Sequence, residues 1–434
     1  MTENLRPYQR ELIKLTRFAF SAGAGSVCMQ LGTGGGKTHT AAAMLADCSR
    51  AGMRSLFLAH LDTLVSDTHR RLNAHGVGAG FVQAGRPSDP TAPVQVASMQ
   101  TLLARGTRPP ADFIILDECH RSEAAGVRDI LSAYPNAGLL GLTATPQRGD
   151  GQALGNTFKM LVQGPSNRWL TDNGHLVPCE VIGPTSVLED RLAGDPVEAY
   201  LKYAPGTRAI VFAASIPEAL TLTGRFPLAA CITGDTPREE RELRYAQIES
   251  GELRVLVSVN VFTEGFDLPC IESVVLARLC SVTASFLQRI GRGLRPSVGT
   301  GKTKCLVLDM CGSTHLHGLP DEDRAWSLEG DAVRRTEKMD AIVHCKECMA
   351  MFRPSPVCPR CGATTAGAAR IPKKISRTEK LERLDSVPPH VRDASYLRRL
   401  RWVAETRIGL YGARAEQWSL GRFRKQFGRE PVTA

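Results

Sequence analysis

The sequence predicts an α/β protein with two tandem domains, each built on a parallel β-sheet. Short apolar runs alternate with helical patterns from residue 1 to about 165, and the alternation starts again from about 205 to 320. Continuous apolar strands separated by helices are typical of parallel sheets that are buried on both faces. The chain has 434 residues, which is enough for two or three domains with separate cores.

Five strands are expected in each domain. Those of the first domain, residues 1–165, are Ser26–Leu31, Ser55–His60, Val94–Met99, Phe113–Glu118 and Leu139–Ala144. Those of the second domain, residues 205–320, are Ala209–Ser215, Leu228–Gly234, Arg254–Asn260, Ser273–Arg278 and Lys304–Met310. Gly, Pro and Asn are frequent between the domains, so residues 166–204 are expected to be a connector with irregular structure.

The composition is that of a soluble globular protein, with 43% hydrophobic and 23% charged residues. The first residues are polar and lack the apolar region of a secretory signal. No uncharged apolar stretch reaches the ~18–20 residues that span a bilayer. The thirteen cysteines are odd in number and show no regular disulfide pattern. These features predict a protein of the reducing cytoplasm.

The segment LGTGGGKT, residues 31–38, follows an expected strand and precedes an expected helix, which is the context of a phosphate-binding loop. Lys37 is expected to reach the outer phosphates, and the Thr38 hydroxyl to bind Mg²⁺. Leu31 stands where the strict pattern has its first glycine, so a glycine-rich structural turn remains the alternative. The glycines that would let backbone N–H groups approach phosphate oxygens are Gly34, Gly35 and Gly36.

The expected strand Phe113–Glu118 ends with two carboxylates, at the edge where parallel sheets place their ligands. Asp117 is expected to hold Mg²⁺, directly or through water. Glu118 is expected to polarise the attacking water as general base. An acidic residue at such a junction often caps a helix, which is the structural alternative.

The segment QRIGRGLRP, residues 288–296, carries arginines at helical spacing. Arg292 and Arg295 share one face of a helix, so both are expected to contact a γ-phosphate across a cleft. Such an arginine raises phosphoryl-transfer rates by roughly 10³-fold or more in related NTPases. In isolation, the segment would also fit a basic helix exposed to solvent.

Four cysteines within residues 340–365 form two CxxC pairs separated by nine residues: Cys345, Cys348, Cys358 and Cys361. Two such pairs present four thiolates to one tetrahedral Zn²⁺, and the CPRCG turn is typical of zinc ribbons. A redox role for the pairs is the alternative. So short a segment is expected to fold around its metal.

The excess positive charge lies at the C-terminal end. Of the 54 Lys and Arg and 44 Asp and Glu, residues 363–434 hold 16 basic and 7 acidic residues, which is +9 of the net +10. Residues 370–434 are expected to form a basic helical tail. Basic tails bind phosphate backbones or acidic partner segments, and a solvated surface is the neutral alternative.

Together these segments resemble superfamily 2 helicases of the DEAD/DEAH type, and within them the RadD-like DNA-repair ATPases of bacteria and phages. The resemblance covers about residues 1–320 and also includes LRPYQ, LTATP, ITGDTP and VNVFTEGFD. It implies two RecA-like domains that clamp ATP and Mg²⁺. DECH replaces the usual DEAD or DEAH, and Gln288 replaces a frequent histidine, so features of RNA helicases are not carried over.

The resemblance also implies roles for residues outside the loop and the acidic pair. Arg6 and Gln9 would read adenine, and Gly265 and Asp267 would lie near the ribose and phosphates. Contacts with the nucleic-acid backbone would come from Ser98, Gln100, Thr101 and Thr263. The residues that would couple the state of ATP to the grip on nucleic acid are His120, Thr143, Thr145 and Gln288.

The leading hypothesis is an ATP-dependent DNA helicase or DNA-stimulated ATPase of repair, recombination or replication, with ATP, Mg²⁺ and Zn²⁺ as cofactors. Single-stranded or branched DNA is the expected partner, RNA remains open, and a single-stranded-DNA-binding or recombination protein is a candidate protein partner. Two alternatives remain: a translocating subunit of a restriction or phage-defence system, and a nucleic-acid-binding adaptor with a vestigial ATPase.

Overall fold

The structure is a computed structural model of the chain. It describes residues 5–60, 62–147, 153–189, 191–259, 268–329 and 342–365, and the single residues 397, 416, 417, 419, 420 and 424. The chain divides into two units, Met1–Ile371 and Pro372–Ala434. Thr263, Gly265 and Asp267 lie outside the described residues, and so does almost all of the expected basic tail.

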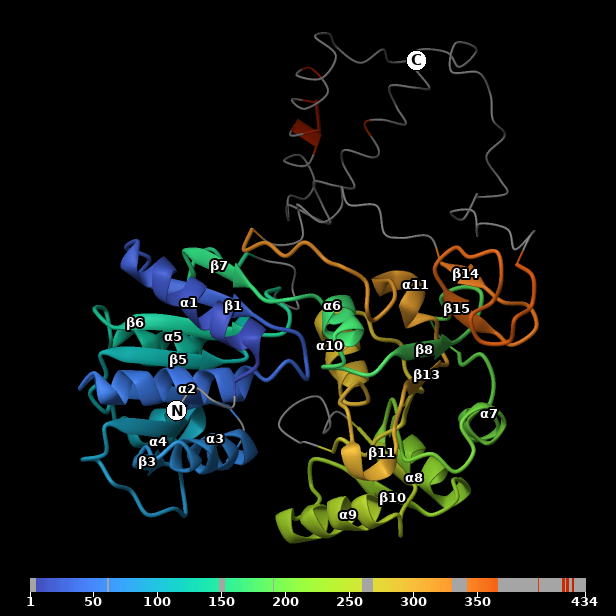
Figure 1. The fold of residues 1–434 in the computed structure, drawn as a ribbon, viewed down its shortest axis with the longest axis horizontal. Coiled ribbons are helices and arrows are strands. Elements are labelled where there is room, and N and C mark those ends of the chain that lie inside the picture. The colour runs from blue at the N-terminus through green and yellow to red at the C-terminus, as the bar shows by residue number, and fades with distance from the viewer. Residues whose placement is uncertain are drawn as a thin grey trace. The chain divides into compact units, whose positions relative to one another are not determined.

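Within the described residues, the first sheet has seven parallel strands in the order β3-β4-β2-β5-β6-β1-β7 (Figure 1). The strands are β1 (Ser26–Gln30), β2 (Ser55–Ala59), β3 (Ala79–Val82), β4 (Val94–Ser98), β5 (Phe113–Asp117), β6 (Gly138–Thr143) and β7 (Met160–Gln163). The helices are α1 (Pro7–Ser21), α2 (Lys37–Arg50), α3 (Asp62–Ala74), α4 (Met99–Arg105) and α5 (Ala125–Ser132), with a short 3₁₀ turn at Cys119–Arg121. Strands β2, β4 and β5 are buried along their whole length, because helices cover both faces of the sheet.

The second sheet has eight described strands in the order β10-β11-β9-β12-β13-β8-β15-β14. The strands are β8 (Cys179–Ile182), β9 (Ala209–Phe212), β10 (Ala229–Ile232), β11 (Val255–Ser258), β12 (Ser273–Leu276), β13 (Cys305–Asp309), β14 (Val343–His344) and β15 (Ala350–Phe352). The helices are α6 (Asn167–Asp172), α7 (Pro196–Tyr203), α8 (Ile216–Arg225), α9 (Arg238–Ser250), α10 (Thr283–Gly291) and α11 (Ser313–His317), with a 3₁₀ turn at Val298–Thr300. Strands β8 to β13 pair in parallel, whereas β15 pairs antiparallel with β8 and with β14.

The predicted α/β class with two RecA-like parallel sheets is therefore confirmed, and all ten expected strands are present. The expectation of irregular structure between the domains is wrong. Residues 166–204 contain α6, β8 and α7, and β8 is a parallel strand of the second sheet that pairs with β13. With only four residues, β8 carries too weak an apolar pattern to stand out, and pairing with a neighbouring strand stabilises it.

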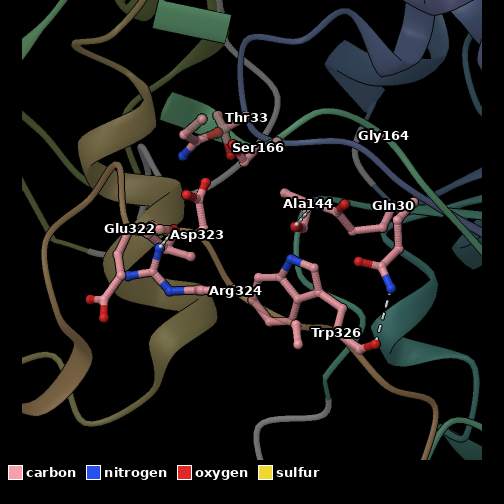
Figure 2. Close-up of a pocket in the computed structure, with 14 residues that line it drawn as sticks. Gln30, Thr33, Ala144, Gly164, Ser166, Glu322, Asp323, Arg324 and Trp326 are labelled. Atoms are coloured by element: carbon pink, nitrogen blue, oxygen red, sulfur yellow. Dashed lines mark hydrogen bonds between the residues drawn. The ribbon is translucent and has the colours of Figure 1, made fainter. Parts of the chain in front are cut away.

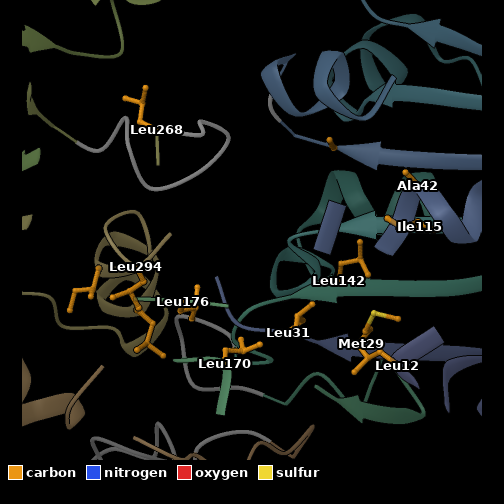
Figure 3. Packing of buried hydrophobic residues seen from close by; sticks show 14 of the residues in the cluster. Leu12, Met29, Leu31, Ala42, Ile115, Leu142, Leu170, Leu176, Leu268 and Leu294 are labelled. Atoms are coloured by element: carbon orange, nitrogen blue, oxygen red, sulfur yellow. The ribbon is translucent and has the colours of Figure 1, made fainter. Parts of the chain in front are cut away.

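The largest apolar cluster continues from the first domain into the end of α10 (Figure 3). Leu170 and Leu176, which follow the first sheet, pack in the same cluster as Leu31 and Leu294. The Val177 amide donates to the Leu294 carbonyl at 2.8 Å. The end of α10 is thereby fixed beside the phosphate-binding loop.

After β13 and α11 the chain returns to the first domain as a strap, defined here as residues 319–328. The Gln163 amide donates to the Trp326 carbonyl at 3.1 Å, and the Gly155 N–H donates to the Leu328 carbonyl at 2.9 Å. Arg168 forms an ion pair with Asp323 at 3.1 Å. The strap lines one side of a cavity of about 550 Å³, and Figure 2 shows the residues that line it. The strap therefore joins the second domain to the edge of the first sheet.

No helix among the described residues is long and apolar enough to cross a membrane.

Candidate functional site

A cavity of about 280 Å³ lies between the first sheet and α10, and residues of both domains line it. From the first domain come the predicted loop and acidic residues Gly34, Gly36, Lys37, Thr38, Asp117 and Glu118. From the second domain come Gln288, Arg292 and Arg295. The cavity thus brings together residues that are about 170 or more positions apart in the sequence, as predicted.

The loop between β1 and α2 depends on its glycines. Gly34 and Gly36 have φ values of +86° and +91°, a backbone conformation that other residues rarely adopt. A Cβ on Gly36 would lie 2.3 Å from the Gln9 amide nitrogen. Lys37 begins α2, and its Nζ donates to the Leu31 carbonyl at 3.4 Å. The loop is therefore closed tightly over its own lysine, with the N-terminus of α2 facing the cavity.

Helix α1 holds this loop from the other side. The Gln9 amide and the Tyr8 hydroxyl both donate to the Gly35 carbonyl, at 3.0 and 2.8 Å. The Gln9 side-chain oxygen accepts from the Arg6 N–H at 3.0 Å. Arg6 lines the cavity, whereas Gln9 is buried beside the loop. Reading of adenine by Gln9 and Arg6 stays a prediction.

The two acidic residues lie at the carboxyl end of β5 and differ in their electrostatics. Glu118 has φ +48°, a strained value that turns its side chain into the cavity. Burial and the charge of Glu118 raise the pKa of Asp117 to about 7, although Lys37 acts in the opposite direction. Burial also raises the pKa of Glu118, but its hydrogen bond with His120 and the charges of Lys37, His120 and Arg292 lower it to about 2.

The donor set fits Mg²⁺, which takes hard oxygen ligands. The Asp117 carboxylate and the Thr38 hydroxyl line the same cavity. A buried carboxylate that is costly to ionise beside another carboxylate is stabilised by a nearby cation. Thr38 and Asp117 would therefore hold the ion, which would neutralise phosphate charge.

The four predicted coupling residues form a chain of contacts that begins at Glu118. The Gln288 amide of α10 donates to Glu118 Oε2 at 3.3 Å, and His120 Nδ1 lies 3.3 Å from the same oxygen. Thr143 Oγ1 lies 3.5 Å from His120 Nδ1 and accepts from the Thr145 N–H at 3.1 Å. The first and second domains thus meet at the Glu118 carboxylate.

The arginines of the second domain divide between two places. Arg292 and Arg295 line the cavity, and the Arg295 side chain passes 3.5 Å from the position of a Cβ on Gly34. Arg289 points away from the cavity, stacks 5.2 Å above the Phe212 ring and donates to the Cys280 thiol. Helix α10 itself ends at Gly291, so Arg292 follows it directly.

The predicted nucleic-acid contacts of the first domain lie around the end of β4 and the start of α4. Ser98 and Thr101 are buried, and Thr101 Oγ1 accepts from the Ala84 N–H at 3.3 Å. Gln100 is exposed. Of these three residues, Gln100 presents its side chain to solvent, and the role of all three stays a prediction.

The four clustered cysteines converge. Their Sγ atoms all lie within 4.8 Å of one another, with 3.7 Å between Cys345 and Cys361 and 3.6 Å between Cys348 and Cys358. Ligands 2.3 Å from a tetrahedral Zn²⁺ would be about 3.8 Å apart, so the spacing fits the metal. Each pair forms the same turn, because the Met349 N–H donates to the Cys345 carbonyl and the Gly362 N–H to the Cys358 carbonyl.

The cysteine segment is also part of the second sheet. Its strand β15 pairs antiparallel with β8, and His344 Nε2 lies 2.6 Å from the Gly183 carbonyl. Arg353 forms a two-pronged ion pair with Asp321 at the start of the strap, with both contacts at 3.0 Å. The cysteine segment thus extends the sheet of the second domain.

Residues that the sequence did not single out also lie in this cavity or in its wall, among them Tyr8 and His175. Tyr8 contacts the loop through its hydroxyl, and His175, from the segment after α6, lines the cavity. The sequence did contain a signal for Tyr8, because it is the aromatic residue next to Gln9 in the LRPYQ segment. Nothing in the local sequence marks His175, because its place depends on how the connector folds.

Profiles of two known families match the chain in order. The profile described as "Type III restriction enzyme, res subunit" matches residues 2–148, and "Helicase conserved C-terminal domain" matches residues 194–297. The chain is 27% identical over 357 residues to a 51.5 kDa protein of a Lactococcus phage, and the match covers 76% of each protein.

Two further similarities concern longer proteins. The putative ATP-dependent helicase IRC3 of Saccharomyces cerevisiae is 24% identical over 409 residues, covering 77% of this chain and 58% of the yeast protein. The fragment structure of a putative HsdR subunit of a type I restriction enzyme from Vibrio vulnificus has a TM-score of 0.58 at 23% identity, covering 73% of this chain and 66% of that chain. The chain therefore spans less than two thirds of the yeast relative, and the HsdR likeness concerns the fold.

The match to the restriction-subunit profile is thus followed along the chain by the match to the helicase C-terminal profile. The chain belongs to the superfamily 2 helicases of the DEAD/DEAH type and is an ATP-hydrolysing, helicase-like motor.

Proposed function

We propose that the chain is a DNA-stimulated ATPase whose two domains close on ATP and Mg²⁺ and thereby move along or remodel DNA. The observation that carries the proposal is the contact between Gln288 and Glu118, which joins the second domain to the carboxylate nearest the expected point of chemistry. A site completed by both domains can act only when they are close together. Hydrolysis is then coupled to the closing and opening of the two domains.

Within this site each residue has a distinct task. Lys37 binds the outer phosphates, while Thr38 and Asp117 hold Mg²⁺. Glu118 is ionised and accepts a hydrogen bond from the attacking water, which orients the water towards the γ-phosphate. Arg292 and Arg295 stabilise the charge that develops on that phosphate.

We assign one Zn²⁺ to Cys345, Cys348, Cys358 and Cys361. The spacing of the four sulfur atoms supports this, and so do the two matching turns. The ion would be structural, because four thiolates leave no open coordination position.

Nucleic-acid binding is a property of this superfamily, and for this chain we propose DNA as the partner. The basic tail would supply contacts with phosphates, and single-stranded or branched DNA is the expected substrate. RNA is the competing partner, and a single-stranded-DNA-binding or recombination protein is the proposed protein partner. The cysteine content supports a cytoplasmic location.

For the biological role we propose repair, recombination or replication, in the manner of the RadD-like ATPases that the motifs resemble. A translocating subunit of a restriction or phage-defence system is a second candidate of equal standing. The match of residues 2–148 to a restriction subunit and the HsdR-like fold favour it. A vestigial ATPase is the least favoured reading, because the complete set of expected catalytic side chains shares one cavity.

The test is the ATPase rate of the full chain with single-stranded DNA, a fork, long duplex DNA and RNA of matched length. A remodelling ATPase of repair is expected to respond most to single strands or forks. A restriction-type translocase is expected to respond to duplex, and more strongly as the duplex is lengthened. Stimulation by RNA alone would contradict the DNA assignment, and no hydrolysis under any condition would contradict the motor.

A further inference from the structure

An aromatic cluster lies at one end of the nucleotide cavity. It consists of Tyr8 from α1, Trp169 from α6 and His175 from the segment that follows α6. The ring centroids of Tyr8 and His175 are 5.0 Å apart, those of Tyr8 and Trp169 are 5.8 Å apart, and those of Trp169 and His175 are 5.9 Å apart. Of the three, His175 lines the cavity, next to Arg6 on the first domain and Pro296 on the second.

The cluster is tied to the phosphate-binding loop through one tyrosine. The Tyr8 hydroxyl donates to the Gly35 carbonyl at 2.8 Å and accepts from the Arg6 guanidinium at 3.1 Å. The Tyr8 ring lies against His175, so the imidazole is separated from the loop by the length of that ring. A nucleotide has the same order of parts, with its phosphates at one end and a flat base at the other.

His175 is held firmly in this place. Its backbone N–H donates to the Leu170 carbonyl at 2.7 Å. The next residue, Leu176, is buried, and its side chain lies 2.8 Å from the position of a Cβ on Gly34. Burial and the charge of Arg6 lower the pKa of His175, which favours the neutral form of the ring. A neutral, fixed aromatic ring is suited to stacking against a nucleobase.

The opposite end of the cavity is less suited to a base. It is formed by His39 at the start of α2 and by Leu64, Asp67 and Arg71 of α3. Asp67 and Arg71 lie 3.8 Å apart, and Asp67 also pairs with Arg70. This end therefore presents the ion-paired surface of α3 beside the His39 imidazole, which packs 5.4 Å from the His75 ring, whereas the other end presents His175 with the Tyr8 ring behind it.

Resting on the proposed ATPase function, we infer that His175, supported from behind by Tyr8, is the surface on which the purine base of ATP stacks. The Arg6 guanidinium beside it donates to the ring nitrogens of the base. His175 is thus a residue for binding and positioning the nucleotide. The catalytic residues remain those around Glu118.

The test compares two ligands on the full chain carrying Glu118→Gln, which blocks turnover. Calorimetry measures the binding of ATP, which has a base, and of inorganic tripolyphosphate, which has none. Adding His175→Ala should weaken ATP binding roughly tenfold, because a stacked aromatic side chain contributes about that much per base. Tripolyphosphate binding should stay within twofold. His175→Tyr should restore ATP binding, since it also offers a flat ring.

Two matched variants sharpen the result. His69→Ala removes another imidazole that stacks on an aromatic ring, 3.7 Å from Phe81, but lies outside the cavity; it should change neither ligand. His39→Ala probes the opposite end of the cavity. A loss of ATP affinity in the His39 variant and not in the His175 variant would overturn the inference.

Two other results would also overturn it: unchanged ATP binding in His175→Ala, or equal weakening of ATP and tripolyphosphate. Equal weakening of both ligands would mean that His175 affects binding through the phosphate-binding loop and not through the base. If the parent protein binds neither ligand, the proposed ATPase function fails, and the inference fails with it.

Discussion

Gln288 donates a hydrogen bond to the carboxylate of Glu118 at 3.3 Å, across the cleft between the two domains. The same carboxylate oxygen lies 3.3 Å from His120, which in turn lies 3.5 Å from Thr143. Glu118 is therefore in contact with the second domain and, through His120, with the end of β6. A change around the Glu118 carboxylate during hydrolysis would therefore be transmitted to the second domain and to the end of β6.

Replacing Gln288 should slow hydrolysis without abolishing nucleotide binding. Gln288→Ala removes a donor to a charged carboxylate, a contact of about 1.5–3 kcal/mol, so kcat should fall by roughly tenfold or more. Gln288→Glu should be worse, because it places a second negative charge against Glu118 in a buried site. Steady-state kinetics with KM and kcat separated is the measurement. A normal kcat in both variants would mean that this contact does not serve catalysis.

Close packing between α10 and the phosphate-binding loop should be sensitive to one added methyl group. A Cβ on Gly291 would lie 2.5 Å from the Thr33 Cβ, a distance that real atoms do not tolerate. Gly291→Ala should therefore hold the domains apart and lower ATPase activity strongly. The matched control is Gly299→Ala, where a Cβ would have no heavy atom within 4 Å. Equal activity in the two folded variants would show that hydrolysis does not depend on the close packing of Gly291 against Thr33.

The protein should contain one Zn²⁺ per chain, and loss of the ion should destabilise the second domain. Strand β15 extends the sheet through β8, so an unfolded cysteine segment would leave that edge unpaired. Cys361→Ser changes an exposed ligand and should lower both zinc content and melting temperature. Cys48→Ser, outside the cluster, should change neither. Elemental analysis that finds no zinc in protein purified without chelators would refute the assignment.

The basic tail should bind DNA non-specifically. Each phosphate that its arginines neutralise should add ~0.7–0.9 to the slope of log affinity against log salt. Deletion of residues 370–434 should weaken binding and flatten that slope, while hydrolysis without DNA persists. The measurement is fluorescence anisotropy over a salt series. Unchanged affinity and slope would instead point to a tail that docks a protein partner.

The sequence predicted the fold and the gathering of the loop, the acidic pair and the two arginines, for a simple reason. Parallel sheets place the carboxyl ends of their strands at one edge, so Lys37 and Asp117 had to be neighbours once the strands were recognised. The buried strands were recognisable because their apolar runs are continuous. Short β3, β7 and β8 were missed, since pairing with neighbours stabilises them more than their own residues do.

The remaining features depend on contacts between distant segments. The return of the strap to the first domain through Trp326, the pairing of β15 with β8 and the place of His175 in the cavity are examples. None of these leaves a local pattern, because each depends on the shape of two surfaces that exist only after folding.

In the proposed mechanism, one site completed by both domains hydrolyses ATP. The most direct measurement is a single-turnover hydrolysis assay, combined with ATP binding, on Glu118→Gln and Arg292→Ala in the full chain. Both variants should fold and bind ATP, and each should lose hydrolysis by roughly 10³-fold, since one lacks the water-orienting carboxylate and the other the γ-phosphate contact. Near-normal hydrolysis by either pure, folded variant would contradict the claim.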